Sequence, residues 1–436
     1  MVSIDLIFAL IFYSLILLFF LKTRKNWQIQ GGIIALYRTK IGLSFMDVLA
    51  KKDTKKHISI IGIILSIMGI VLLLLNIFIL NPYLIGSGSM LLLIGLLIVL
   101  PLRWLGNIGV VIGFIGMIFI FFILIKSSWS LFFVEGAQST LAPVLPGVHV
   151  PGLPTLSFWH WIVSIFILAV VHEFSHGIIA RLYQIKVKSS GIGFLGPILL
   201  AFVEPDEKQI SRVKKSAQLS IFAAGPFSNI LLGALSMLFF LFILAPMSNI
   251  ILEYDGISVS CFSKGFPAEK SGLEIPFTIT AINGIKTISI SEFINATKDI
   301  KPDQEITLTT NERTVAITTI QDPKNATKGF MGIEGLSQKT KTKNTMPKSI
   351  GTFFTWFSIL VMWTFFINIG VGLFNLLPLG PIDGGRMFFV VATKILKDGN
   401  KAKKAWMITM YIVLFLIFIN LIPWLNKLIR FIAELF

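Results

Sequence analysis

Two histidines and a glutamate, His172, His176 and Glu173, form the pattern HExxH inside a strongly apolar stretch, residues 158–179. On a helix, residues four positions apart leave the same face, so both imidazoles can ligate one zinc ion. Glu173 lies beside them and can take a proton from the attacking water. Because ionisable groups are costly in lipid, such a cluster in a membrane segment indicates a functional site. The pattern therefore predicts zinc-dependent hydrolysis of peptide bonds within the membrane.

A catalytic zinc requires a third protein ligand beside an open position for water. The chain has five histidines, and the other three are expected in a cytoplasmic loop or at the far side of the membrane. Asp383 is the strongest candidate, because Pro378 and Pro381 release the preceding segment from helical geometry and let a carboxylate turn inward. Two alternatives stay open: Asp383 caps the following helix, or the histidines pack together without metal.

The composition is that of a polytopic membrane protein. Of the 436 residues, 55% are hydrophobic and 14% are charged, whereas ordinary soluble domains carry about 25% charged residues. The net charge of +16 arises in short loops beside apolar segments, where basic residues mark the cytoplasmic side. We therefore expect no nucleic-acid partner. Cys261 is the single cysteine, which excludes an intrachain disulfide and a thiolate zinc cluster.

The apolar segments predict an all-α polytopic fold with about eight transmembrane helices. The basic stretch 22–57 places that loop in the cytoplasm and the N-terminus outside. The first apolar segment lacks a basic leader and a small-residue cleavage site, so it is expected to remain as a helix. Residues 27–49 mix apolar and basic side chains, as in a segment that lies on the membrane surface. The expected spans are residues 4–21, 58–80, 85–102, 106–125, 158–182, 217–245, 350–377 and 405–424.

Two further segments are not expected to span. Residues 189–205 are apolar but short and are broken by glycine and proline, which predicts a re-entrant hairpin buried against protein. Residues 254–335 are polar, contain alternating β-type runs and an Asn-Gly turn at 283–284, and predict a soluble β-rich domain outside the membrane. At 1.5 Å per residue, His172 lies roughly 21 Å below the outer boundary of the membrane, so the active site is expected toward the cytoplasmic side.

The re-entrant hairpin admits two interpretations. An exposed strand edge can pair with an unwound substrate by β-addition, and Gly191, Gly193 and Gly196 would permit a close approach. Alternatively, the hairpin is a plug over the site.

These segments predict six parts of the chain, in which the catalytic core is split by an insertion. They are the N-terminal transmembrane helices with their cytoplasmic basic loop (1–126), an extracytoplasmic Pro/Gly-rich loop (127–157), the first part of the core (158–249), the inserted β-rich domain (250–345), the second part of the core (346–404) and a C-terminal transmembrane helix (405–436).

The chain resembles the site-2 protease family of intramembrane zinc metalloproteases. The resemblance rests on the HExxH helix, on the later motif NxxPxxxxDG that begins at Asn375, and on the PDZ-like domain between them. The resemblance covers about residues 157–397 and includes Ala-Ala-Gly-Pro-Phe-Ser-Asn at 223–229. The extra N-terminal helices resemble archaeal and eukaryotic-type members. Residues 263–284 resemble the family's PDZ pattern, which implies screening of substrates or binding of a new C-terminus; the alternative is a β-rich spacer.

The resemblance implies regulated intramembrane proteolysis with one Zn²⁺. The resemblance implies that the zinc ligands are His172, His176 and Asp383 and that the general base is Glu173. It also implies that Asn375 and Asn229 contact the substrate or the oxyanion.

The expected partners are transmembrane protein substrates and membrane lipid, in a multi-pass protein of the plasma membrane. The main alternative is a transporter or channel whose His and Asp bind a transported cation. That alternative gives no reason for Glu173 beside His172, and no inverted repeat is visible. The second alternative is an inactive relative, and the presence of all four chemical residues argues against it. The physiological substrate and the oligomeric state are not predicted.

Overall fold

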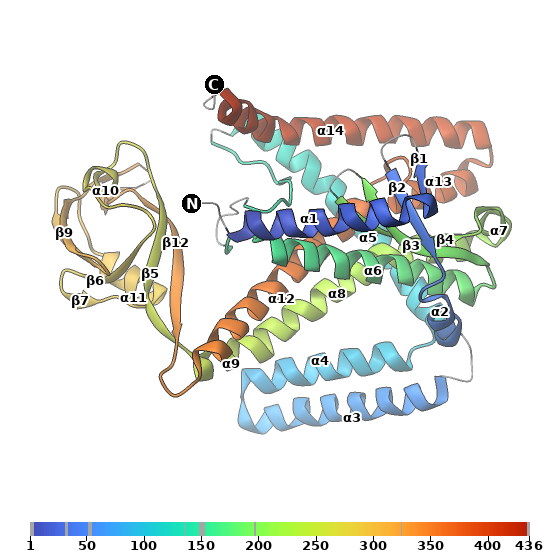
Figure 1. The fold of residues 1–436 in the computed structure, drawn as a ribbon, viewed down its shortest axis with the longest axis horizontal. Coiled ribbons are helices and arrows are strands. Elements are labelled where there is room, and N and C mark those ends of the chain that lie inside the picture. Colours follow the sequence, from blue (N-terminus) through green and yellow to red (C-terminus); the bar gives the residue numbers. More distant parts are fainter. Residues whose placement is uncertain are drawn as a thin grey trace. The chain divides into compact units, whose positions relative to one another are not determined.

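The computed structural model describes residues 4–30, 34–50, 55–134, 136–147, 153–195, 198–323 and 325–433. Its elements fall into two compact units (Figure 1). The first unit comprises Met1–Pro146, Ser157–Ile243 and Leu360–Phe436. The second comprises Gly147–Leu156 and Leu244–Ile359. Each unit has its own core and is described by itself.

Helices make up most of the first unit. They are α1 Ile4–Thr23, α2 Leu43–Ala50, α3 Lys55–Ile79, α4 Pro82–Val99, α5 Leu102–Phe133, α6 Phe158–Leu182, α7 Glu207–Arg212, α8 Lys215–Phe239, α13 Asp383–Leu396 and α14 Gly399–Ala433. The long helix α12, Lys348–Asn375, ends in this unit.

Seven helices within the described residues are long and apolar enough to cross a membrane. The spans are Asp5–Asn26, Ile60–Ile77, Leu102–Phe133, Phe158–Leu182, Lys215–Ile251, Lys348–Asn375 and Gly399–Asn426. The eighth segment that we expected is α4, a shorter apolar helix. The chain is therefore an integral, multi-pass membrane protein, while the total of eight spans stays a prediction.

Among the boundaries that differ from the sequence-based ones are the end of α5 and the start of α14. Helix α5 continues to Phe133 through the start of the expected loop at 127, because Ser127–Phe133 contains neither proline nor glycine to end it. Helix α14 begins at Gly399, before the expected start of the span at 405, so Lys401, Lys403 and Lys404 lie in its first turns. In the expected loop 127–157, residues 135 and 148–152 lie outside the described residues.

A four-stranded antiparallel sheet joins two distant parts of the first unit. Its strands are β1 Trp27–Gln30, β2 Ile34–Thr39, β3 Val187–Leu195 and β4 Ile198–Pro205, in the order β1-β2-β3-β4. Strands β3 and β4 form a hairpin over residues 189–205, with Gly196 and Pro197 outside the described residues. Within the described part of the chain, no strand pairs with the outer edge of β4.

That residues 27–49 lie on the membrane surface stays a prediction. They form β1, β2 and α2, and β2 pairs with β3 from Ile34↔Leu195 to Thr39↔Ser190. One edge of β2 is therefore paired with a strand about 150 residues away in the sequence, which local amphipathicity could not reveal.

Gly191 is close to β2 and not to open space for a substrate. A Cβ at this position would overlap the backbone oxygen of Tyr37. Changing Gly191 to alanine is expected to disturb the pairing of β2 with β3 and to destabilise the protein by about 1–3 kcal/mol, as overpacking does. The measurement is the apparent Tm of the purified protein in detergent. Gly399→Ala is the matched control, since a Cβ there would meet nothing within 4 Å. Equal Tm values for the two variants would contradict the observed pairing.

A row of small residues lets α5 lie close to the elements that carry the site. Four glycines spaced three or four residues apart are buried in α5. Small residues of this kind allow membrane helices to pack with their backbones near one another. The glycines and the side chains that a Cβ would meet are Gly106 (Ser220), Gly109 (Phe227), Gly113 (Met387) and Gly116 (Leu376). Helix α5 thus supports both α8 and the start of α13.

The second unit is rich in β structure. Its elements are β5 Leu252–Phe262, α10 Pro267–Lys270, β6 Phe277–Ile282, β7 Ile285–Lys286, α11 Ile290–Thr297, β8 Glu305–Thr310, β9 Thr314–Thr318, β10 Ile320–Asp322, β11 Asn325–Phe330 and β12 Ile333–Thr342. The main sheet has the order β12-β5-β6-β8-β9, with β7 on β6. Alternating apolar side chains of β5, β6 and β8 form its core with Phe293 of α11. A PDZ-like identity for this unit stays a prediction.

Candidate metal centre

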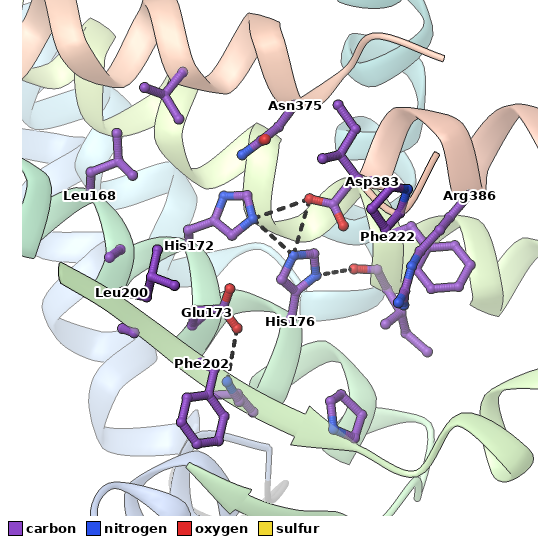
Figure 2. Close-up of a pocket in the computed structure, with 18 of the residues that line it drawn as sticks. Leu168, His172, Glu173, His176, Leu200, Phe202, Phe222, Asn375, Asp383 and Arg386 are labelled. Atoms are coloured by element: carbon purple, nitrogen blue, oxygen red, sulfur yellow. Dashed lines mark hydrogen bonds and ion pairs between the residues drawn. The ribbon is translucent and has the colours of Figure 1, made fainter. Parts of the chain in front are cut away.

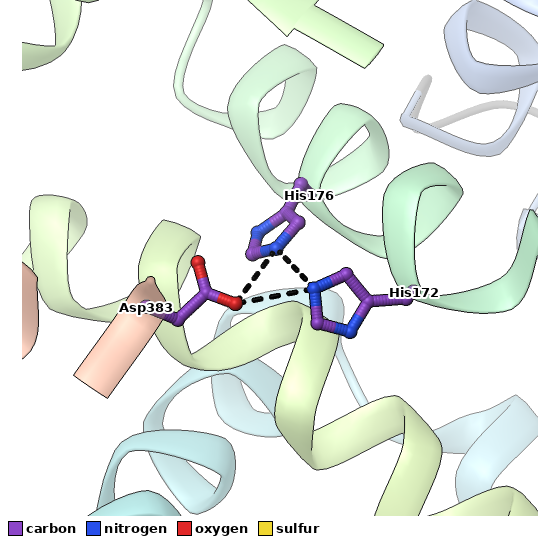
Figure 3. Close-up of side chains that lie close together, drawn as sticks. All are labelled: His172, His176 and Asp383. Atoms are coloured by element: carbon purple, nitrogen blue, oxygen red, sulfur yellow. Dashed lines mark hydrogen bonds and ion pairs between the residues drawn. The ribbon is translucent and has the colours of Figure 1, made fainter. Parts of the chain in front are cut away.

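His172 and His176 leave the same face of α6, and Asp383 at the start of α13 lies directly opposite them (Figure 3). The two Nε2 atoms are 3.2 Å apart. Oδ2 of Asp383 is 3.1 Å from Nε2 of His172 and 3.4 Å from Nε2 of His176. The structure thus brings together all three predicted ligands, with their ligand atoms within 4.8 Å of one another.

This spacing fits a zinc ion. Zinc–nitrogen and zinc–oxygen distances of about 2.0–2.2 Å in a tetrahedron place neighbouring ligand atoms roughly 3.3 Å apart. The three observed separations, 3.1, 3.2 and 3.4 Å, match that value. Two imidazoles and a carboxylate also form a three-ligand set that leaves a fourth position open, as catalytic zinc sites do. The donor set and its geometry therefore fit the metal that the motif predicts.

Asp383 is the first residue of α13 rather than its N-cap. The cap position is Ile382, and no side-chain cap hydrogen bond is present there. The chain reaches this position through a sharp turn after α12, and Leu376 and Leu377 are fully buried in it. A Cβ at Gly384 would overlap the backbone of Leu376. Glycine at this position therefore lets the chain fold back on itself and aim the carboxylate at α6.

Helix α8 contacts the Nδ1 atoms of both histidines. Nδ1 of His176 lies 2.7 Å from the backbone oxygen of Ile221, and Nδ1 of His172 lies 3.0 Å from the side-chain amide of Asn229. Metal-ligating histidines typically make such a second contact, which orients the ring. Sequence analysis missed the Ile221 contact, because a backbone acceptor leaves no side-chain signal.

Gly225 of α8 lies against both ligand nitrogens. A Cβ at this position would be 2.5 Å from Nε2 of His172 and would also overlap Nε2 of His176. Real Cβ atoms do not approach other atoms so closely. The motif at 223–229 did not by itself predict that Gly225 makes room for the two histidines. The sequence holds one signal of this: Gly225 precedes Asn229 by one helical turn.

Glu173 points into a cavity of about 590 Å³ that contains the three ligand residues (Figure 2). Its Oε2 accepts a hydrogen bond of 2.9 Å from the backbone N–H of Val203 in β4. The lining of the cavity includes β4 residues 199–203. The predicted general base is thus next to the ligands and also next to the free edge of the sheet.

The two asparagines occupy different positions. Asn375, the last residue of α12, lines the cavity and reaches toward His172 (Figure 2). Asn229 is fully buried behind His172 and is not among the residues that line the cavity. Only Asn375 is therefore placed to contact a substrate in this arrangement.

A charged pair that sequence analysis did not single out lies at the cavity wall. Nη1 of Arg386 is 2.8 Å from Oε1 of Glu207, and its guanidinium lies over the ring of Phe222 at 5.3 Å. Both charged residues line the cavity, and Glu207 is largely exposed. The cavity therefore has a polar end where α7 and α13 meet.

A family model described as Peptidase family M50 matches residues 160–419, more than half of the chain. The chain belongs to this family, the site-2 proteases. This M50 peptidase is 28% identical over 384 residues to an uncharacterized protein of Methanocaldococcus jannaschii, covering 87% of this chain and 82% of the relative. It is also 25% identical over 311 residues to a protein of Clostridium acetobutylicum named "Putative zinc metalloprotease", covering 53% of this chain and 86% of the relative. The family identifies the chain as a membrane metalloprotease with zinc as the implied metal.

Proposed function

We propose that this M50 peptidase hydrolyses peptide bonds within or next to transmembrane segments of membrane-protein substrates. The observation that carries the proposal is the cavity in which the ligand set, Glu173 and a free strand edge meet. A transporter would need the His and Asp residues but would have no use for Glu173 beside them. An inactive relative would have lost at least one of these four groups.

Zinc in this centre would act as a Lewis acid toward water and the scissile carbonyl. Glu173 takes the proton as water attacks and then delivers it to the leaving amine, so one carboxylate acts first as base and then as acid. Asn375 is positioned to donate its side-chain N–H to the carbonyl oxygen, where negative charge develops. The apolar side chains of β4 and α6 that line the cavity limit the access of bulk water.

The substrate must be extended at the scissile bond, because a helix hides its carbonyls in its own hydrogen bonds. The N–H of Val203 points away from β3 toward Glu173. Because the backbone groups of every second residue face the same edge of a strand, Leu199 and Ala201 also present theirs to the cavity. An unwound substrate segment would therefore add to β4 as a fifth strand. If the hairpin were only a plug, the free edge of β4 would not need to face the cavity.

The proposed setting is the plasma membrane, with the site toward the cytoplasm and the second unit, PDZ-like, outside. Basic residues of the α7–α8 region and of the start of α14 support the cytoplasmic side for these helix ends. Substrates would be transmembrane proteins, in regulated intramembrane proteolysis, with lipid as the surrounding partner. The sequence of α10 and its neighbours, residues 263–273, supports a PDZ-like role in selecting substrates.

The test measures zinc content together with cleavage of a transmembrane substrate in proteoliposomes, for wild type and Asp383→Ala. We expect about one zinc per wild-type chain, and loss of both metal and cleavage in the variant, because two histidines alone leave the metal underligated. Wild-type protein without zinc, or cleavage that survives in Asp383→Ala, would contradict the proposal. Zinc transport into the vesicles without cleavage would favour the transporter instead.

A further inference from the structure

Asn229 combines complete burial with an unusual pairing. Its side chain is 0% exposed, and its Nδ2 atom is 3.0 Å from Nδ1 of His172. In this orientation the Oδ1 atom of Asn229 is buried without a hydrogen-bond partner among the described residues. A buried acceptor of this kind costs about 1–3 kcal/mol, so the arrangement requires an explanation.

The oxygen and nitrogen of an asparagine amide have nearly the same shape, and their assignment follows from the hydrogen-bond partners. With Nδ2 toward the ring, Nδ1 of His172 must be the acceptor, and a neutral ring then carries its proton on Nε2. That proton would occupy the direction of Asp383 and His176, where a metal ligand needs a lone pair. With Oδ1 toward the ring, Nδ1–H is the donor and Nε2 keeps its lone pair, while Nδ2 takes the position that Oδ1 left.

The second histidine supplies an independent comparison. Nδ1 of His176 lies 2.7 Å from the backbone oxygen of Ile221. A carbonyl oxygen can only accept, so Nδ1 of His176 carries a proton and its Nε2 is free to ligate. His172 needs an equivalent acceptor on its own Nδ1, and the group in contact with that atom is the amide of Asn229. Both acceptors come from α8, two helical turns apart.

We propose that Asn229 is a positioning residue of the metal centre. Its side-chain oxygen accepts the Nδ1–H of His172 and holds the ring in the tautomer whose Nε2 can ligate zinc. This role replaces the substrate contact expected from the sequence, because Asn229 lies behind His172 and away from the cavity lining. The inference rests on the proposed function only in that the three-residue centre binds zinc.

The test compares Asn229→Leu, which keeps the branched shape but removes the acceptor, with Asn229→Asp, which keeps an acceptor in the same place. The readouts are zinc affinity, from competition with a chromogenic chelator, and the visible absorption spectrum of the cobalt-substituted protein. We expect Asn229→Leu to weaken zinc binding roughly 10–100-fold and to alter the cobalt spectrum. We expect Asn229→Asp to stay within a few-fold of wild type, since carboxylates are common partners of ligating histidines.

Asn368→Leu is the matched control. Asn368 is also fully buried in the same unit, and its amide binds the backbone oxygen of Thr364 and not a ligand. We expect this variant to keep wild-type zinc affinity, even where its Tm falls. Unchanged affinity in Asn229→Leu, or equal losses in Asn229→Leu and Asn229→Asp, would overturn the inference and leave the proposed function standing. A wild-type protein that binds no zinc would overturn both.

Discussion

Changing Gly225 to alanine is expected to abolish zinc binding and, with it, proteolysis. The added methyl group would sit 2.5 Å from Nε2 of His172 and would overlap Nε2 of His176. Both rings are held from α8 by contacts to Ile221 and Asn229, so they cannot move aside without losing these partners. The methyl group would occupy space that a metal held by these two nitrogens would need. The measurement is zinc content after purification, together with cleavage of the transmembrane substrate.

Gly370→Ala is the matched control for this prediction. Gly370 lies in α12, also a membrane-length helix, but a Cβ there would meet nothing within 4 Å. An alanine at this position raises helix propensity by about 1 kcal/mol and leaves the site untouched. Zinc content and cleavage should therefore equal those of wild type. A Gly225→Ala protein that is folded, loaded with zinc and active would show that α8 does not approach the ligands as closely as described.

Changing Glu173 to glutamine is expected to stop turnover while the zinc stays bound. Glutamine keeps the size and an oxygen that can accept from the N–H of Val203, so the local structure should persist. It cannot take the proton from water, and general-base catalysis typically contributes about 10²–10⁴-fold to the rate. The measurement is the cleavage rate at saturating substrate, with zinc content determined on the same sample.

Glu207→Gln controls for the loss of a carboxylate from the same cavity. Glu207 lines the cavity but pairs with Arg386 rather than with the ligand set. We expect its replacement to leave the rate within a few-fold of wild type, because no proton transfer passes through it. Turnover by Glu173→Gln at the wild-type rate would exclude Glu173 as the base. A loss of zinc in that variant would instead assign it to the metal centre.

Several features follow from local sequence. The apolar runs identify the membrane helices, since each run must be long enough to cross the bilayer and free of unpaired charge. The spacing of His172 and His176 places both rings on one face of any helix, whatever surrounds it. Glu173 follows from the same motif. Asp383 could be named from the prolines around it, although its approach to 3.1 Å from His172 depends on the fold.

Other features depend on contacts between segments that are far apart in the chain. Strand β2 pairs with β3, which lies about 150 residues away in the sequence. The sequence of a short run such as 34–39 does not predict which strand will pair with it. The sequence also does not predict which face of α8 contacts the histidines, because Ile221 acts through its backbone and Gly225 through the absence of a side chain.

The physical reason for this division is the range of the interactions. Helix periodicity, membrane length and the spacing of HExxH are set by neighbours within a few residues, so composition and order determine them. The position of Asn229 behind His172, and of β4 beside Glu173, results from packing of elements whose surfaces fit in three dimensions. The sequence therefore names the candidate zinc ligands and the candidate base. The fold determines how α8 orients the ligands and which strand edge faces the cavity.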